Sequence, residues 1–353
     1  MSATCPSCGE EVTPGDSYCE ACGGALDEGD GGAGLPTAVR SVDATTCPGC
    51  DAPGDDATPD GYCGHCGRRW SPIREHEEVV DGPVAAVTDR GIDHWRNEDA
   101  VGLCWVGGTE GTDGTDGSPG GFALVVCDGV SASQEPQLVS QAAVDAAVPV
   151  LRDALVSGAD LADAMVEATA AAQEAAAAIP NEPGLDVGPG ACTFVAAAVR
   201  DGSATFAQVG DSRAYWVDAD GARQIGRDDS LAAELVASGR VNAQQAMAGP
   251  AGHTVTKWLG FDAVDAAPTI TRLDLPGPGL VLAVSDGLWN YTPEVDDLHR
   301  LVGPLGQEPA IALARRLIAF AEDSGGADNV TVAVGPHELD LPIDEPNGQE
   351  EAT

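Results

Sequence analysis

The residues of this sequence best suited to chemistry are acidic side chains next to short apolar runs. A single Asp followed by Gly is most often a turn. Four acidic sites beside apolar runs in one chain are harder to explain as turns. If a sheet brings the ends of such runs together, the carboxylates form an oxygen-rich pocket for hard divalent cations. The acidic residues at these four sites are Glu98, Asp99, Asp128, Asp286 and Asp328.

The apolar runs predict the strands that position these carboxylates. They cover residues 84–87, 122–127, 280–284 and 330–334 and consist largely of Val, Leu and Ala. Short runs of this composition, bounded by Gly, Asp or Asn, are typical of buried strands. We therefore expect each carboxylate to stand at the end of a strand.

The intervening segments predict helices and further strands. Apolar residues recur at helical spacing over 136–155, and residues 160–179 are rich in alanine with Asp160 as the expected N-cap. A stretch of Gly, Asp and Thr at 109–121 predicts an unstructured hairpin tip, and the Pro- and Gly-rich segment 181–190 breaks the helical pattern. Further helices are expected over 229–236, 295–301 and 309–321, and further strands over 193–199, 204–209 and 214–217.

Eight of the eleven cysteines form two similar units near the N-terminus. Each unit has two Cys-x-x-Cys pairs, a Tyr before its third Cys and a Gly after its last. Four thiolates at this spacing bind one tetrahedral zinc ion, and hairpins this small lack a core without the metal. Disulfides are the alternative, and the paired spacing favours two structural Zn²⁺. His65 lies inside a complete four-Cys set and is expected to be a bystander. The expected ligands are Cys5, Cys8, Cys19 and Cys22 in the first unit and Cys47, Cys50, Cys63 and Cys66 in the second.

Composition sets the class of protein and its partners. The formal net charge of −40 argues against binding to nucleic acid or an anionic membrane, because both need a basic surface. No apolar run is long enough to span a membrane, and the N-terminus lacks a secretory signal pattern, so we expect a cytoplasmic protein. We expect zinc ribbons at 1–24 and 47–70, linkers at 25–46 and 71–82, a large domain at 83–335 and a disordered acidic tail at 336–353.

Seven motifs of the large domain occur in an order that resembles the metal-dependent type 2C (PPM) serine/threonine protein phosphatases. The resemblance implies an α+β fold, a four-layer α-β-β-α sandwich of two antiparallel sheets. The motifs are Thr88-Asp-Arg-Gly with Asn97-Glu-Asp99, then Val126-Cys-Asp-Gly129, Gly190-Ala-Cys-Thr193, Val209-Gly-Asp-Ser-Arg-Ala-Tyr215, His253-Thr-Val-Thr-Lys-Trp-Leu-Gly260, Ser285-Asp-Gly-Leu-Trp289 and Ala327-Asp-Asn-Val-Thr331.

The same resemblance implies roles for individual residues. Asp128 would bridge two Mn²⁺ or Mg²⁺ ions, and Asp99 would hold a water bound to the metals. Two cations that share a carboxylate activate water and clamp phosphate oxygens for in-line attack. The remaining implied ligands are Glu98 and the Gly129 carbonyl at one ion, Asp286 and Asp328 at the other, and Asp211 at a third, weaker metal.

The sequence also departs from the family at several positions. His94 stands where the family has the arginine that grips phosphate, so Arg96, or alternatively Arg90, is expected to take that role. Residues 130–132 read Val-Ser-Ala instead of His-Gly-Gly or Met-Gly-Gly, which removes a general acid. Asn290 replaces an additional acidic ligand.

Three functions are compatible with these features. The first is a phosphatase that removes phosphate from Ser and Thr of proteins phosphorylated by a cognate kinase, with the zinc ribbons as a docking module. The second is a catalytically weak, phosphatase-like adaptor that binds phosphoproteins, which the changes at His94 and Val130 favour. The third is a purely structural zinc protein. The retained carboxylates argue against the third and favour the first.

Overall fold

A computed structural model describes residues 3–4, 11–12, 37–41, 76–107, 120–185, 187–247, 249–339 and 341–342. The eight cysteines expected to bind zinc lie outside these residues, as do most of the predicted loop at 109–121 and most of the predicted acidic tail. The chain divides into two units, Met1–Leu35 and Pro36–Thr353. In the first unit, β1 (Ala3–Thr4) pairs with β2 (Glu11–Val12) in antiparallel orientation.

The second unit contains all the longer elements. Its strands are β3 (Thr37–Ser41), β4 (His76–Asp81), β5 (Val84–Asp89), β6 (Ala100–Val106), β7 (Gly121–Cys127), β8 (Ala191–Cys192), β9 (Phe194–Arg200), β10 (Ser203–Val209), β11 (Arg213–Val217), β12 (Ala222–Ile225), β13 (Leu259–Gly260), β14 (Thr269–Asp274), β15 (Gly279–Val284) and β16 (Val330–His337). Its helices are α1 (Pro136–Ser157), α2 (Leu161–Ala177), α3 (Leu231–Ala237), α4 (Ala243–Met247), the 3-10 turn η2 (Pro250–His253), α5 (Asp286–Trp289), α6 (Val295–Val302) and α7 (Ala310–Asp323).

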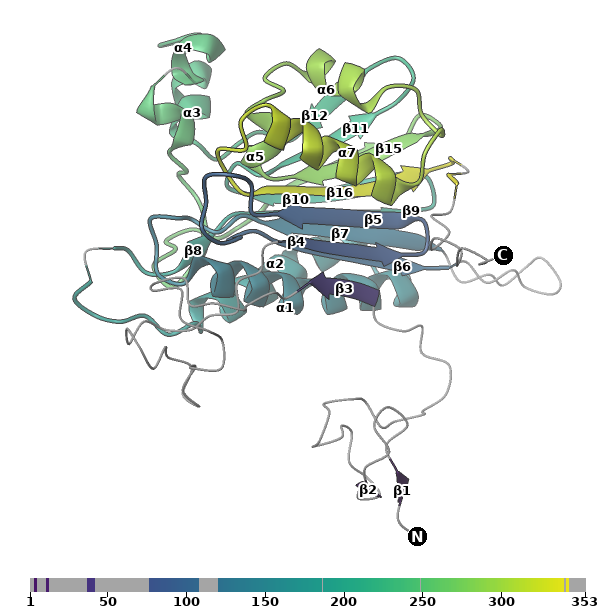
Figure 1. Cartoon of the computed structure of the whole chain (residues 1–353), viewed down its shortest axis with the longest axis horizontal. Coiled ribbons are helices and arrows are strands. Elements are labelled where there is room, and N and C mark those ends of the chain that lie inside the picture. The colour runs from purple at the N-terminus through teal and green to yellow at the C-terminus, as the bar shows by residue number, and fades with distance from the viewer. Residues whose placement is uncertain are drawn as a thin grey trace, which may run out of the picture. The chain divides into compact units, whose positions relative to one another are not determined.

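Most of these strands form two antiparallel sheets. One has five strands in the order β14-β10-β9-β7-β6, and the other has seven in the order β12-β11-β15-β16-β5-β4-β3. Helices α1 and α2 cover the five-stranded sheet, while α5, α6 and α7 lie on the outer face of the seven-stranded one (Figure 1). The predicted four-layer α-β-β-α sandwich is therefore confirmed.

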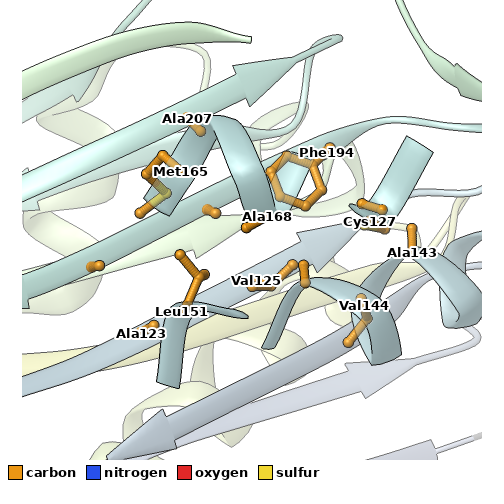
Figure 2. Packing of buried hydrophobic residues seen from close by; sticks show 14 of the residues in the cluster. Ala123, Val125, Cys127, Ala143, Val144, Leu151, Met165, Ala168, Phe194 and Ala207 are labelled. Carbon is orange, nitrogen blue, oxygen red and sulfur yellow. The ribbon is translucent and has the colours of Figure 1, made fainter. Parts of the chain in front are cut away.

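Strand β7 is buried on both faces, which explains why its sequence is apolar throughout. Ala123, Val125 and Cys127 point toward α1 and α2, where they pack with Leu151 and Phe194 (Figure 2). The alternate residues of β7 belong to the cluster between the two sheets. Because side chains alternate along a strand, burial on both faces requires an unbroken apolar run.

Capping residues mark the start of α2 and the end of α1. The Asp160 side chain accepts hydrogen bonds from the backbone N–H groups of Ala162 and Asp163 at the start of α2, as predicted for an N-cap. Gly158 ends α1 with φ of 72°, a left-handed conformation that glycine adopts without strain. None of the helices in the described part of the chain is long and apolar enough to cross a bilayer.

The expectation that 71–82 is a linker is wrong for β4, which is a strand of the seven-stranded sheet. Its acidic sequence obscured this, because strands are usually poor in Glu and Asp. The acids are compensated: the His76 ring bonds to Asp89 (2.7 Å), and Arg315 of α7 forms two hydrogen bonds to Glu78. Likewise β3 falls within the predicted linker 25–46, and β16 continues to His337, beyond the predicted domain end.

Candidate metal centre

Asp128 stands where β7 ends, tied to the neighbouring strand by hydrogen bonds. Its backbone N–H donates to Thr193 Oγ1 (3.1 Å), and its carbonyl accepts from the N–H of Thr193 (2.8 Å). A Cβ added to Gly129 would lie 2.6 Å from the carbonyl oxygen of Glu98. Only glycine therefore allows the Asp128 segment and the Glu98 segment to approach this closely.

Asp286 occupies the equivalent position after β15, as the first residue of α5. A Cβ on Gly287 would lie 2.0 Å from the carbonyl oxygen of Asn329, so glycine again permits two site segments to meet. The indole N–H of Trp289, also in α5, donates to the backbone carbonyl of Asp211 (3.0 Å). This bond fixes the Asp211 segment against the helix that carries Asp286.

Asn329 joins the loop before β6 to the start of β16. Its side-chain oxygen accepts from the N–H of Glu98 (2.7 Å), and its amide group donates to the carbonyls of Arg90 (2.8 Å) and Arg96 (3.0 Å). The neighbouring Asp328 is thereby held near the Glu98 segment, although the two are far apart in sequence.

Asp99 is fully buried, with one oxygen engaged and one available. Its Oδ2 accepts a hydrogen bond from Thr331 Oγ1 (2.7 Å), which also contacts Thr88 Oγ1 (2.6 Å). Its Oδ1 makes no hydrogen bond to any described residue. A buried carboxylate oxygen without a donor is costly unless water or a cation compensates it.

The carboxylates lie close enough to repel one another. Burial, and then the charges of Asp328 and Asp286, raise the pKa of Asp99 to about 7. Burial, with Asp286 and Asp228 nearby, raises the pKa of Asp211 to about 8. Burial also raises the pKa of Asp128 well above its ordinary value, and four neighbouring aspartates add to the effect.

This donor set fits a hard divalent cation. Its expected donors are carboxylate oxygens and the Gly129 carbonyl oxygen, and Mg²⁺ and Mn²⁺ prefer such oxygen donors over softer ones. In the present rotamers, no three His, Cys, Asp or Glu side chains of the described ranges converge closely enough to enclose an ion.

The structure places both arginines expected to grip phosphate and the histidine that replaces the family's arginine. His94 contacts Asp328 (Nε2 to Oδ1, 3.1 Å), and Arg90 donates to the carbonyl of His94. Arg96 stacks over the Trp95 ring (4.4 Å) and donates from Nε to Glu98 Oε1 (2.8 Å). Its two terminal nitrogens make no hydrogen bond or ion pair within the described ranges, so a planar fork of donors is left for a ligand.

The structure places the predicted aspartates near one another. It also places beside them polar residues for which the sequence predicts no role. Electrostatic coupling joins Asp128 to Asp99, Asp211, Asp286 and Asp328. Asn290 donates to Asp286 Oδ2 (3.2 Å). The residues without a predicted role are Ser131, Asn329 and Thr331. Asn329 and Thr331 follow Asp328 within one motif, and this proximity in sequence is the signal that could have identified them.

Comparisons with known proteins agree with this arrangement. The protein phosphatase 2C family matches residues 111–314, and the double zinc ribbon family matches residues 5–67. The serine/threonine protein phosphatase PstP of Mycobacterium tuberculosis is 30% identical over 251 residues, which are 71% of this chain and 44% of that protein. The chain thus spans under half the length of this relative.

Solved structures show the same architecture. The crystal structure of the M. tuberculosis phosphatase PstP/Ppp has a TM-score of 0.56 and 27% identity, and covers 71% of this chain and 96% of that one. A second structure of its catalytic domain, in complex with two manganese ions, has a TM-score of 0.52 at 27% identity with the same coverage. A Streptococcus agalactiae serine/threonine phosphatase with 22% identity and a TM-score of 0.56 shares the fold, covering 71% of this chain and 97% of that one. With a family match that spans more than half of its residues, the chain belongs to the protein phosphatase 2C family.

Proposed function

We propose that this protein is a metal-dependent phosphatase that hydrolyses phosphoserine and phosphothreonine in proteins phosphorylated by a cognate kinase. The observation that carries the proposal is the group of mutually repelling aspartates around Asp128, contributed by segments far apart in sequence. A cluster of like charges is unfavourable by itself and becomes favourable around cations.

Two Mn²⁺ or Mg²⁺ ions are the proposed occupants, with Asp211 available to a third. Bound there, they would supply positive charge that lowers the pKa of water and neutralises phosphoryl oxygens. The proposed ligands are Glu98, the Gly129 carbonyl, Asp128, Asp286 and Asp328.

Asp99 and Arg96 would act directly on water and phosphate. The hydrogen bond from Thr331 fixes the Asp99 carboxylate, so its other oxygen can orient the attacking water. Arg96 is anchored through Nε and offers its terminal nitrogens to two phosphoryl oxygens. Together these groups would hold nucleophile and phosphorus in line, which is most of what phosphoryl transfer requires from protein side chains.

A cleft of about 440 Å³ beside Asp328 offers room for a protein substrate. Met247, Trp289, Tyr291 and Pro293 supply its apolar lining. A mostly apolar cleft that opens at a charged centre suits a peptide whose phosphorylated residue enters the centre while a neighbouring side chain fills the cleft.

A catalytically weak adaptor is the second candidate, and the position of His94 favours it. This imidazole lies on Asp328 in place of the guanidinium found in the family, and a single histidine cannot grip phosphate with two parallel hydrogen bonds. An adaptor of this kind would bind phosphopeptides in the presence of metal yet release phosphate very slowly.

We assign two structural Zn²⁺ to the ribbon segments and propose that these segments dock a protein partner. A tethered module raises the local concentration of a partner without taking part in the chemistry. The double zinc ribbon match at residues 5–67 supports the metal assignment.

The deciding experiment is hydrolysis of a phosphothreonine peptide with and without Mn²⁺. Phosphate release that depends on Mn²⁺ supports the phosphatase. Peptide binding with no Mn²⁺-dependent release supports the adaptor instead and contradicts the phosphatase.

A further inference from the structure

The carboxylate of Glu98 is held by two side chains at once. Arg96 donates from Nε to Oε1 at 2.8 Å, and the hydroxyl of Ser131 donates to Oε2 at 2.5 Å. The Glu98 side chain is only 4% exposed, so water competes little with these bonds. Both oxygens of one proposed metal ligand are thus oriented by donors.

The backbone of Glu98 is fixed as well. Its N–H donates to the side-chain oxygen of Asn329 (2.7 Å), and its carbonyl accepts from the hydroxyl of Ser140 (2.6 Å). Because both backbone groups of Glu98 are bonded, the side-chain torsions are its main remaining freedom. Ser131 and Arg96 are the groups that restrict those torsions.

Ser131 is well placed to act as a rigid donor, although the residue itself is exposed. It lies in a turn closed by the hydrogen bond from Ser133 N–H to the Val130 carbonyl (2.9 Å). Val130 is in turn anchored by its N–H to the carbonyl of Ala191 (2.9 Å). The turn follows Asp128 and Gly129 directly, so the hydroxyl is linked to the strand end that carries the central carboxylate.

Arg96 and Ser131 should influence a bound cation differently. A carboxylate oxygen has two lone pairs, so an oxygen that accepts one hydrogen bond can still bind a metal ion. The guanidinium brings a positive charge that repels a nearby cation, whereas the hydroxyl brings none. The hydroxyl therefore orients Glu98 without weakening the attraction of the carboxylate for the ion.

We propose that Ser131 is a positioning residue that holds Glu98 in the rotamer required to bind one of the two metal ions. This inference rests on the metal centre of the proposed function. It assigns a role to a residue in the segment where the sequence departs from its family, between Val130 and Ala132. Hydrogen-bond partners of metal ligands commonly change metal affinity by ten- to a hundredfold when they are removed.

The test is a titration of the full-length protein with Mn²⁺, in which the electron paramagnetic resonance signal measures the free Mn²⁺. Ser131→Ala should weaken one of the two Mn²⁺ sites by about tenfold and leave the other within about twofold. Ser131→Thr keeps the hydroxyl and should bind like the unmodified protein. Ser238→Ala is the matched control, because Ser238 is also exposed and its hydroxyl donates to the carbonyl of Leu235 in α3, away from the metal centre.

Thermal unfolding of the metal-free proteins supplies the second readout. Equal unfolding temperatures, together with weakened Mn²⁺ binding in Ser131→Ala alone, support positioning rather than a general structural role. Unchanged affinity in Ser131→Ala, or an equal loss in Ser131→Thr, overturns the inference. A protein that binds two Mn²⁺ yet hydrolyses no phosphopeptide contradicts the proposed phosphatase without touching this result, whereas a protein that binds no Mn²⁺ contradicts both.

Discussion

Replacing Asp211 by asparagine should stabilise the metal-free protein at pH 8. Asp211 is 6% exposed, and burial together with Asp286 and Asp228 raises its pKa from 3.8 to about 8. Asparagine has nearly the same shape without the charge. The backbone carbonyl that accepts the hydrogen bond from Trp289 is kept, so the segment should stay in place.

The sign and size follow from proton linkage. Between pH 3.8 and about 8 the folded chain keeps a proton on Asp211 that the unfolded chain releases, so stability falls as pH rises through this range. At about 1.4 kcal/mol per pH unit, the upper limit at pH 8 is about 6 kcal/mol. The repulsion is shared with neighbouring carboxylates that can take up protons themselves, so we expect a gain of about 2 kcal/mol.

The assay is urea unfolding in a metal chelator at pH 5 and pH 8. Asp211→Asn should gain about 2 kcal/mol over the unmodified protein at pH 8 and clearly less at pH 5. Asp153→Asn, a change on the exposed surface of α1, is the control and should show no such pH dependence. A destabilised Asp211→Asn, or a gain that is equal at both pH values, refutes the reasoning.

Three further predictions concern parts of the chain outside the metal centre. His76→Gln should lower stability by about 1 kcal/mol at pH 6 after allowance for partial exposure; the hydrogen bond to Asp89 raises the pKa of His76 from 6.5 to about 9, so this loss should fade in unfolding curves as pH rises through 9. Metal analysis of the full-length protein, purified under reducing conditions, should find about two zinc ions per chain by the four-thiolate rule, and disulfides would contradict it. A shortened chain that begins at Glu75 keeps β4 and should hydrolyse a small phosphopeptide at nearly the full-length rate; loss of that rate at full metal loading argues against a docking role for the ribbons.

Much of the fold could be predicted because local pattern and tertiary burial agree. The runs that became β7, β15 and β16 are buried on both faces, so nearly every position is apolar and the strands stand out in the sequence. Helix α2 carries its own N-cap in Asp160. In such segments, neighbouring residues alone contain the information that determines the element.

The remaining strands depend on distant partners, which a sequence pattern does not contain. Strand β4 is acidic, and its Glu78 is paired with Arg315 of α7 and with His76 of the same strand. Strand β14 lies at the edge of the five-stranded sheet, and three of its six residues are exposed, so it lacks a continuous apolar run.

The same distinction applies to the site. Each aspartate could be recognised from its own motif, but the groups that orient them could not. Ser131 and Glu98 are 33 residues apart. Asn329, whose side-chain oxygen accepts a hydrogen bond from the N–H of Glu98, lies 231 residues from it. The first contact requires β6 to pair with β7, and the second requires the two sheets to pack together. The sequence shows that His94 and Val130 depart from the family pattern. That His94 contacts Asp328 could be learned only from the structure.

The most direct test of the proposed metal centre compares Asp128→Asn with the unmodified protein. Initial rates of phosphate release from a phosphothreonine peptide are measured against Mn²⁺ concentration, with Asp153→Asn as the surface control. Four other aspartates lie near the carboxylate of Asp128, and loss of this carboxylate should remove several kcal/mol of stabilisation from the bound cations. The Mn²⁺-dependent rate should therefore fall by about a thousandfold while the protein remains folded. A folded Asp128→Asn protein that retains the unmodified Mn²⁺-dependent rate would contradict the assignment of this cluster as the catalytic centre.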